Sequence, residues 1–316
     1  MHEQIARVPH SIEVHLLYAS IVWLAAWLLT SMQRGTATTK YWIWVATSLN
    51  FVLPLSALPD RFWPSRISWF TSNITPHAMD DISLSEMTIV RLWIVWALGC
   101  ALMFTRLCLR IYIDHRDDRG SHDVRPRFFT HGVPVRFAAS RRGPAVAGIL
   151  RPHISLPDGI DRLLTENELD AVLIHELRHA KRRDNLIRLV HEVSLCALWF
   201  HPLVWITSSR LALYRELSCD ESVTERANGR DLVAALAKLA SPEDVLLLHA
   251  TASSFIRPRL DRLATAQPQR HPASNTMLTL TFCAVLLASA FGPVAQSAAK
   301  YACARTHAPR HDVKAP

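Results

Sequence analysis

The chain has 316 residues, of which 50% are hydrophobic, and a formal net charge of +8. This length allows one or two domains. The six cysteines are scattered without a Cys-x-x-Cys pair, which argues against a disulfide framework and against a cysteine zinc cluster. Arginine and lysine gather beside apolar runs without interleaved aromatic residues, so flanks of membrane helices explain the charge more simply than direct binding of nucleic acid.

Four apolar runs predict membrane-spanning helices, because about 20 apolar helical residues cross the hydrocarbon core of a bilayer. The runs are residues 12–32, 41–58, 87–109 and 277–298. Basic residues concentrate after the first and third runs, so the positive-inside rule places residues 110–276 on the cytoplasmic side. We therefore expect a multi-pass membrane protein. Residues 1–109 would hold three spans, and a short tail, residues 299–316, would follow the fourth.

The second run opens with the aromatic pair Tyr41 and Trp42, which suits the membrane interface. After the third run, residues 110–129 are rich in charge and predict a juxtamembrane linker. Short strands are expected at residues 133–138 and 153–156, because apolar and β-branched residues there are separated by glycine and proline turn residues.

A helix is predicted from about Thr165 to Asp184, and Thr165 with Glu168 forms a capping-box signature at its start. The apolar stretch that follows, residues 186–206, predicts a buried or membrane-dipping helix pair broken at His201 and Pro202. Two further helical stretches are expected downstream. They cover residues 204–227 and 231–264, the second one broken at Ser241 and Pro242.

The string His175-Glu176-Leu177-Arg178-His179 predicts a zinc site. Residues four apart share one face of a helix, so both imidazoles can reach a single Zn²⁺ ion. Glu176 projects close enough to act as the catalytic base on a water held by that ion. The alternative is an ordinary surface helix with a His-Glu face. The apolar residues that precede the motif favour a buried helix and the zinc site.

A catalytic zinc ion needs a third protein ligand and one open position. Glu216, on a predicted downstream helix, is the preferred donor. The competing donors are Glu192, His191, His201 and Glu221. A solvated helix charge paired with a neighbouring arginine is the alternative role for Glu216.

Two aspartates are candidates for supporting the metal ligands. Asp220 lies four residues after Glu216 and shares its helix face, so it can accept a hydrogen bond from the free nitrogen of a bound histidine. Asp184 lies five residues after His179 and either positions the same network or simply ends the helix. Cys219 is predicted to point away from the face that carries Glu216 and Asp220.

Four strings in a fixed order carry a resemblance to a known family. They are residues 148–157, 175–179 with Arg183-Asp184, 199–205 and 215–221, with a weaker echo at residues 257–263. With these strings the chain resembles the BlaR/MecR-type integral-membrane zinc metallopeptidases, an antirepressor family that relays β-lactam sensing. The likeness runs from the first span to about residue 264, and it implies the bacterial inner membrane as the location.

The resemblance implies a mainly α fold, in which multi-span membrane helices carry an inserted gluzincin-like zinc peptidase domain with a small β-hairpin or sheet. Glu216 falls where that family has its third zinc ligand. The implied activity is a metalloendopeptidase that cleaves a cytoplasmic winged-helix repressor, or another regulatory protein, in a signal-transduction pathway. Membrane lipid and a second copy of the chain, forming a homodimer, are further expected partners, and no direct contact with nucleic acid is expected.

Two expectations qualify this interpretation. Antibiotic-sensing members carry an extracellular penicillin-binding domain after the last span, whereas about twenty residues follow it here, so direct β-lactam sensing is not expected. A peptide substrate is expected to bind extended along an exposed edge near residues 153–156. The alternative function is a catalytically inactive membrane scaffold or signal transducer with a vestigial metal site.

Overall fold

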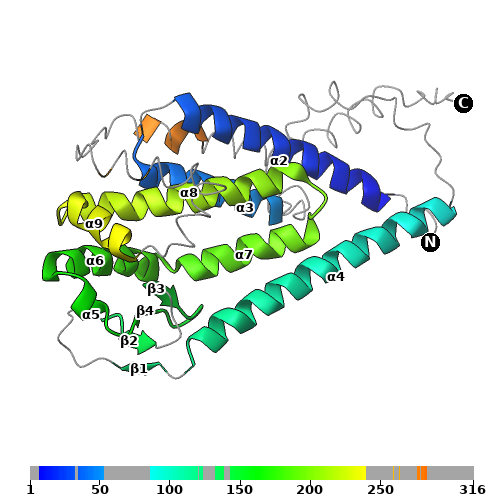
Figure 1. The fold of residues 1–316 in the computed structure, drawn as a ribbon. Coiled ribbons are helices and arrows are strands. Elements are labelled where there is room, and N and C mark those ends of the chain that lie inside the picture. The colour runs from blue at the N-terminus through cyan, green and yellow to red at the C-terminus, as the bar shows by residue number, and fades with distance from the viewer. Residues whose placement is uncertain are drawn as a thin grey trace, which may run out of the picture.

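The computed structural model describes most of the chain. The described residues are 7–32, 35–52, 86–119, 121–123, 132–138, 143–239, 259, 263, 276–277 and 279–282. Among them, helices predominate and one small sheet is present (Figure 1), which confirms the expected mainly α fold with a small sheet.

The elements follow one another in an order close to the prediction. They are α2 (Arg7–Met32), α3 (Ala37–Val52), α4 (Glu86–Asp117), β1 (His122–Asp123), β2 (Val135–Ala138), β3 (Ala145–Ala147), β4 (His153–Pro157), α5 (Ile160–Leu163), α6 (Glu166–Arg182), α7 (Asp184–Ala197), α8 (Pro202–Thr224) and α9 (Gly229–Leu239). The predicted break before Pro202 is confirmed, and Pro202 occupies the first turn of α8, where its missing N–H costs nothing.

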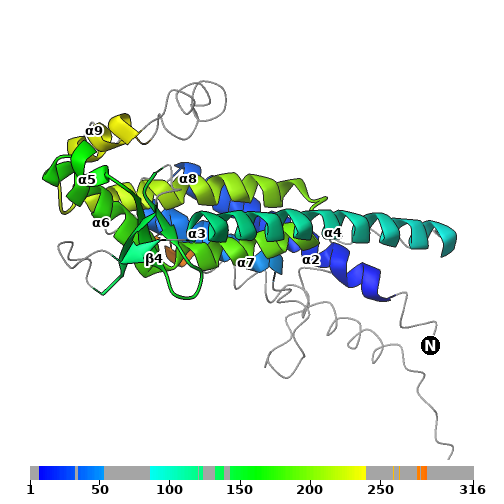
Figure 2. The ribbon, with the colours of Figure 1, turned by 60° about the horizontal axis from the view of Figure 1, so that its bottom comes forward.

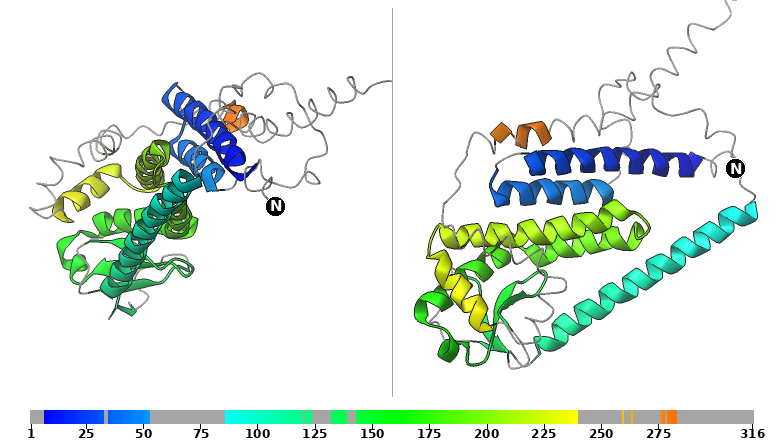
Figure 3. Two further views of the ribbon diagram at one scale, coloured as in Figure 1. Left: turned by 90° about the vertical axis from the view of Figure 1, so that its right-hand side faces the viewer. Right: turned by 45° about the horizontal axis from the view of Figure 1, so that its top comes forward.

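Helices α2, α3, α7 and α8 lie side by side, with α3 packed along α8 (Figures 1 and 3). Their contact is apolar and aromatic: Tyr41 and Trp44 of α3 are buried against Leu211 and Tyr214 of α8. Sequence analysis placed Tyr41 at the membrane interface as an aromatic anchor. The structure instead buries it between helices, because its side of α3 faces α8 rather than the surroundings.

Helix α4 lies outside this layer (Figure 3) and contacts α7 from Trp96, which donates to the Ala197 carbonyl, to Arg110, which donates to Glu192. Within the described residues, only the stretch Met87–Asp117 is both long and apolar enough to cross a membrane, and nearly all of its side chains are exposed. Helices α2 and α3 cover the first predicted span and the start of the second. Most of residues 277–298 lies outside the described residues, so the four-span topology stays a prediction.

The predicted linker at residues 110–129 is partly wrong, because α4 continues as helix through Asp117. His115 and Arg116 stand in its last turn, where the negative end of the helix dipole favours cations. Just beyond, Asp118 accepts hydrogen bonds from His153 Nε2 at 3.0 and 3.2 Å, which tie the end of α4 to the sheet.

The sheet has the strand order β1-β2-β4-β3, with β2 and β4 parallel and the outer pairs antiparallel. The predicted strands at residues 133–138 and 153–156 are confirmed as β2 and β4, whereas β1 and β3 are too short for a sequence pattern to predict. The predicted peptide-binding edge at residues 153–156 is wrong. Strand β4 is buried between β2 and β3, so both of its edges are already paired.

The sheet, α5, α6 and α9 gather at one end of the long helices (Figure 2). Helix α6 begins with the predicted capping box, in which Thr165 and Glu168 each bond to the other's backbone N–H. Its apolar face packs on Ile154 and Leu156 of β4, within one core that also includes Val223 of α8. This packing fixes the orientation of α6, so its other buried residues are directed toward α8.

Candidate metal centre

Helix α6 carries His175 and His179 one turn apart on the face that looks toward α8. Their Nε2 atoms lie 3.2 Å apart, and the two rings meet edge to face. His175 is buried and His179 is nearly so. Two imidazole nitrogens therefore converge on one point at the junction of α6 and α8.

Helix α8 brings Glu216 to the same point. Its Oε2 lies 3.5 Å from His175 Nε2 and 3.8 Å from His179 Nε2. One ligand atom from each of the three residues can be chosen so that all lie within 4.8 Å of one another, a set able to hold a metal ion. Two imidazoles and one carboxylate on packed helices fit a tetrahedral cation that keeps one position open.

The four competing donors lie elsewhere and have other partners. Glu192 pairs with Arg110 of α4, and His191 lies between serines of α3 and α8. The Nε2 of His201 lies 3.5 Å from a serine hydroxyl of α2, while Glu221 accepts the first amide hydrogens of α3. Of the five residues considered as the third ligand, only Glu216 lies beside the two histidines.

Asp184 supports His179 from the opposite side of the ring. Its Oδ2 lies 2.6 Å from His179 Nδ1, so a proton on Nδ1 leaves the Nε2 lone pair free to bind a cation. Arg182 donates to both carboxylate oxygens at 2.6 Å, and the Tyr41 hydroxyl donates to Oδ1 at 3.0 Å. The Arg182 guanidinium also lies 4.0 Å from the centre of the Tyr41 ring.

Asp220 supports His175 in a parallel way, with its Oδ1 3.2 Å from His175 Nδ1. The approach is an ion-pair contact that departs from the line of a well-formed N–H···O bond. Arg259 donates to Asp220 through Nε at 2.8 Å and through Nη2 at 3.0 Å. Sequence analysis did not assign Arg259 a role. The weak echo of the family pattern at residues 257–263 was the available signal.

The prediction that Cys219 points away from the centre is wrong. Its Sγ lies 3.5 Å from His179 Nδ1 and 3.4 Å from an Arg182 nitrogen. His179, Asp184 and Cys219 thus form a second group able to hold a metal by distance alone. However, Asp184 already accepts from Arg182 and Tyr41, and burial raises the pKa of the Cys219 thiol, which disfavours the thiolate that a metal needs.

Carboxylates crowd the centre, and arginines offset part of their charge: Arg215 Nε lies 3.1 Å from Glu216 Oε1, and Arg259 Nη1 lies 3.5 Å from Glu216 Oε2. Burial lowers the pKa of His175, but Asp220 and Glu216 outweigh it and raise that pKa to about 9. Burial raises the pKa of Glu216, whereas His175, His179 and Arg215 together hold it well below its ordinary value. Without a metal, a proton on His175 therefore balances the carboxylates, and a bound cation would replace that proton.

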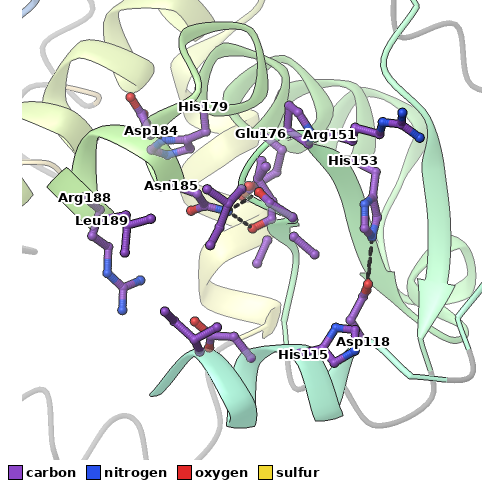
Figure 4. A pocket seen from close by; sticks show the side chains of 18 of the residues that line it. His115, Asp118, Arg151, His153, Glu176, His179, Asp184, Asn185, Arg188 and Leu189 are labelled. Carbon is purple, nitrogen blue, oxygen red and sulfur yellow. Dashed lines mark hydrogen bonds and ion pairs between the residues drawn. The ribbon is translucent and has the colours of Figure 1, made fainter. Parts of the chain in front are cut away.

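A cleft of about 900 Å³ opens beside the two histidines. Its walls come from α4, α6, α7, α8 and the loop around β3, and Figure 4 shows Glu176 and His179 facing into it from α6. Asn185, at the start of α7, donates to the carbonyl oxygens of Val146 and Gly148 at 2.9 and 3.0 Å. This contact holds the edge strand β3 along one wall of the cleft.

Comparisons with known proteins show the family of this chain. A family model described as BlaR1 peptidase M56 matches residues 12–255. The regulatory protein BlaR1 of Bacillus licheniformis is 28% identical over 248 residues, which cover 66% of this chain and 40% of that protein. The methicillin resistance mecR1 protein of Staphylococcus aureus is 24% identical over 102 residues, which cover 32% of this chain and 17% of that protein. The chain thus spans less than half the length of these relatives.

Proposed function

The chain belongs to the BlaR1 peptidase M56 family, and we propose that it acts as a membrane-bound zinc metalloendopeptidase. The observation that carries the proposal is the convergence of His175, His179 and Glu216, with Glu176 in the adjoining cleft. In this proposal the first three residues hold the zinc ion and Glu176 is the general base. Asp184 and Asp220 orient the two imidazoles.

A zinc ion held there would supply a Lewis acid that polarises the scissile carbonyl and lowers the pKa of a water molecule. Asp184 holds a proton on His179 Nδ1, so the lone pair of Nε2 stays free to bind the ion. Asp220 favours the same tautomer of His175 from its place on α8. The two carboxylates therefore set both the charge and the direction of the imidazole ligands.

Glu176 is proposed to move the protons of the reaction. It stands one residue after His175, half-buried, on the wall of the cleft in which the peptide would lie. As general base it takes a proton from the attacking water, and as general acid it returns that proton to the amine that leaves. An extended peptide would run beside β3, the outer strand on this side of the sheet, rather than beside β4.

The location and the substrate belong to the same proposal. The exposed apolar surface of α4 supports insertion in a membrane, and we propose the predicted multi-pass topology with the cleft on the cytoplasmic side. The relatives are named as a regulatory protein and as resistance proteins. Those names place the relatives in regulation and resistance. From the resemblance to the family we propose a cytoplasmic regulatory protein, such as a winged-helix repressor, as the substrate.

The experiment compares cells that express the wild-type chain, Glu176→Gln or Glu166→Gln. Both substitutions remove one carboxylate of α6, but Glu166 is exposed in the first turn, away from the cleft. We expect all three purified proteins to bind one zinc ion. Quantitative proteomics should find at least one protein fragment in wild-type and Glu166→Gln cells that Glu176→Gln cells lack. Identical fragments in all three would instead support the inactive scaffold.

A further inference from the structure

A smaller hollow of about 320 Å³ adjoins the cleft, between α4, α7 and α8. Four arginine side chains line it: Arg106, Arg110, Arg188 and Arg215. All except Arg106 also line the main cleft, so the hollow and the cleft meet along these side chains. The meeting point lies next to the candidate metal centre and is rich in positive charge.

Three of the four arginines have carboxylate partners. Glu192 accepts from Arg110 and lies 3.7 Å from Arg106, and Arg215 Nε lies 3.1 Å from Glu216 Oε1. Arg188 makes no hydrogen bond or ion pair with any residue in the described part of the chain. Among the described residues, one guanidinium of this hollow therefore lacks a direct carboxylate contact.

The surroundings of Arg188 increase its demand for an anion. The side chain is partly buried, and burial together with repulsion from Arg110 and Arg215 lowers its pKa, although attraction to Asp114 and Glu192 offsets part of that shift. The nearby carboxylate of Asp184 is already engaged by Arg182, His179 and Tyr41. Asp114 and Glu192 attract Arg188 without a hydrogen bond or ion pair to it, so a carboxylate brought in by a ligand would supply the direct contact.

The position of Arg188 relates the hollow to catalysis. It follows Asp184 by four residues on α7, and four residues advance a helix by about 6 Å on the same face. Asp184 contacts His179, so Arg188 lies about one helical turn beyond the metal-site network. Figure 4 shows its guanidinium projecting from α7 into the space on the side of α4. A peptide whose scissile bond lies at His179 can therefore place a neighbouring side chain at Arg188.

We propose that Arg188 forms a specificity subsite that binds the carboxylate of an aspartate or glutamate side chain in the peptide substrate. The inference rests on the proposed peptidase function and adds its substrate class, peptides with an acidic residue near the cleaved bond. A planar guanidinium suits a carboxylate because it can donate two parallel hydrogen bonds. The shared wall with the catalytic cleft favours a peptide over a lipid headgroup.

The test measures binding, so it does not depend on turnover. Full-length Glu176→Gln protein, zinc-loaded in phosphatidylcholine nanodiscs, is titrated with fluorescent peptides of one sequence in which a single glutamate is moved along the chain. Each peptide has a glutamine twin, and anisotropy gives both affinities. At one position we expect glutamate to bind about tenfold more tightly than glutamine, as a charge-assisted hydrogen bond allows.

Variants assign that preference to one side chain. Arg188→Gln should abolish it, and Arg188→Lys should keep part of it because a charge remains without the planar fork. Arg230→Gln removes the same charge from the exposed start of α9 and should keep the full preference. A thermal melt of each variant, together with its affinity for the glutamine peptides, verifies that the cleft is intact.

Several outcomes would overturn the subsite. One is no preference for glutamate at any position, and another is a preference that survives Arg188→Gln. A third is that Arg188→Gln reduces retention of phosphatidylglycerol in native mass spectrometry and leaves peptide binding unchanged, which would make the hollow a lipid site. Cleavage of neutral peptides by the wild type would still support the peptidase in all three cases. Failure of that cleavage would count against the peptidase function and would leave the binding result at Arg188 unaffected.

Discussion

The two imidazoles of the candidate centre are supported by similar groups that come from different parts of the chain. His179 relies on Asp184, five residues away, whose carboxylate is held by Arg182, two residues before it in sequence. His175 relies on Asp220 of α8, which Arg259 holds from 39 residues further on. The first support is local and tightly bonded, whereas the second exists only when distant segments pack together.

The local support depends on the one-residue break between α6 and α7. Arg183 adopts the left-handed conformation with φ of 57°, which costs a non-glycine residue about 1–2 kcal/mol. That single residue ends α6 and starts α7 at Asp184, so the carboxylate turns back toward His179. The imidazole of His179 is therefore oriented by the course of the backbone, and that of His175 by tertiary contacts.

The largest effect is expected from Asp184→Asn. The substitution weakens contacts to His179, Arg182 and Tyr41 and leaves the buried Arg182 charge without its carboxylate, so zinc affinity should fall by about 100-fold. Competition with a fluorescent chelator measures the affinity. Asp170→Asn, an exposed aspartate of α6, is the matched control. A loss no greater than in that control would show that the local support is dispensable.

A smaller effect is expected from Asp220→Asn, about tenfold in zinc affinity at high pH, because its contact with His175 is longer and less well aligned. In the wild type, zinc must displace the proton of His175 below its pKa of about 9, so affinity should rise about tenfold per pH unit up to that value. In Asp220→Asn the pKa of His175 is lower, so the zinc affinity should reach its plateau at a lower pH. The advantage of the wild type should therefore be about tenfold above pH 9 and should shrink as the pH falls.

The pH series also provides the outcome that contradicts this prediction. Chelator competition is repeated from about pH 6 to about pH 10 with both proteins. If the plateau of the variant begins at the same pH as that of the wild type, Asp220 does not raise the pKa of His175 and the second support is absent.

The smallest effect is expected from Tyr41→Phe. It removes one hydrogen bond to Asp184 but keeps the ring beneath Arg182, so zinc affinity should fall about threefold, as the net value of one hydrogen bond allows. Tyr112→Phe, at an exposed site on α4, serves as the control. Equal affinities in the two variants would indicate that α3 contributes no support to the centre.

Sequence patterns predicted the features of the fold and of the centre that depend on neighbouring residues. The capping box at Thr165 and the break before Pro202 depend on neighbouring residues, and both are confirmed. The structure also brings Glu216 to the histidine pair of α6, as expected, although the ligand roles of these residues stay predictions. Helical spacing alone is enough to place two imidazoles on one face.

Residues that act across long separations were missed or misjudged. Arg259 carries no local signal for a partner 39 residues earlier, and Tyr41 resembles an interface aromatic until α3 packs on α8. Cys219 was judged from helical spacing alone, which cannot foresee that Arg182 and His179 approach it from α6. Strand β4 was identified, but its central place depends on β3, which is only three residues long.

The attachment of α3 to the centre makes their states mutually dependent. Glu221 of α8 accepts the amide hydrogens of Ala37 and Thr38, and one turn later Tyr41 reaches Asp184. A sliding or rotation of α3 against α8 alters the carboxylate that orients His179, and thermodynamic reciprocity requires that filling the centre bias α3 in return. A soluble fragment of residues 110–276 would lack α3 and its contacts with Glu221 and Asp184. Activity and its control therefore have to be studied on the full 316-residue chain.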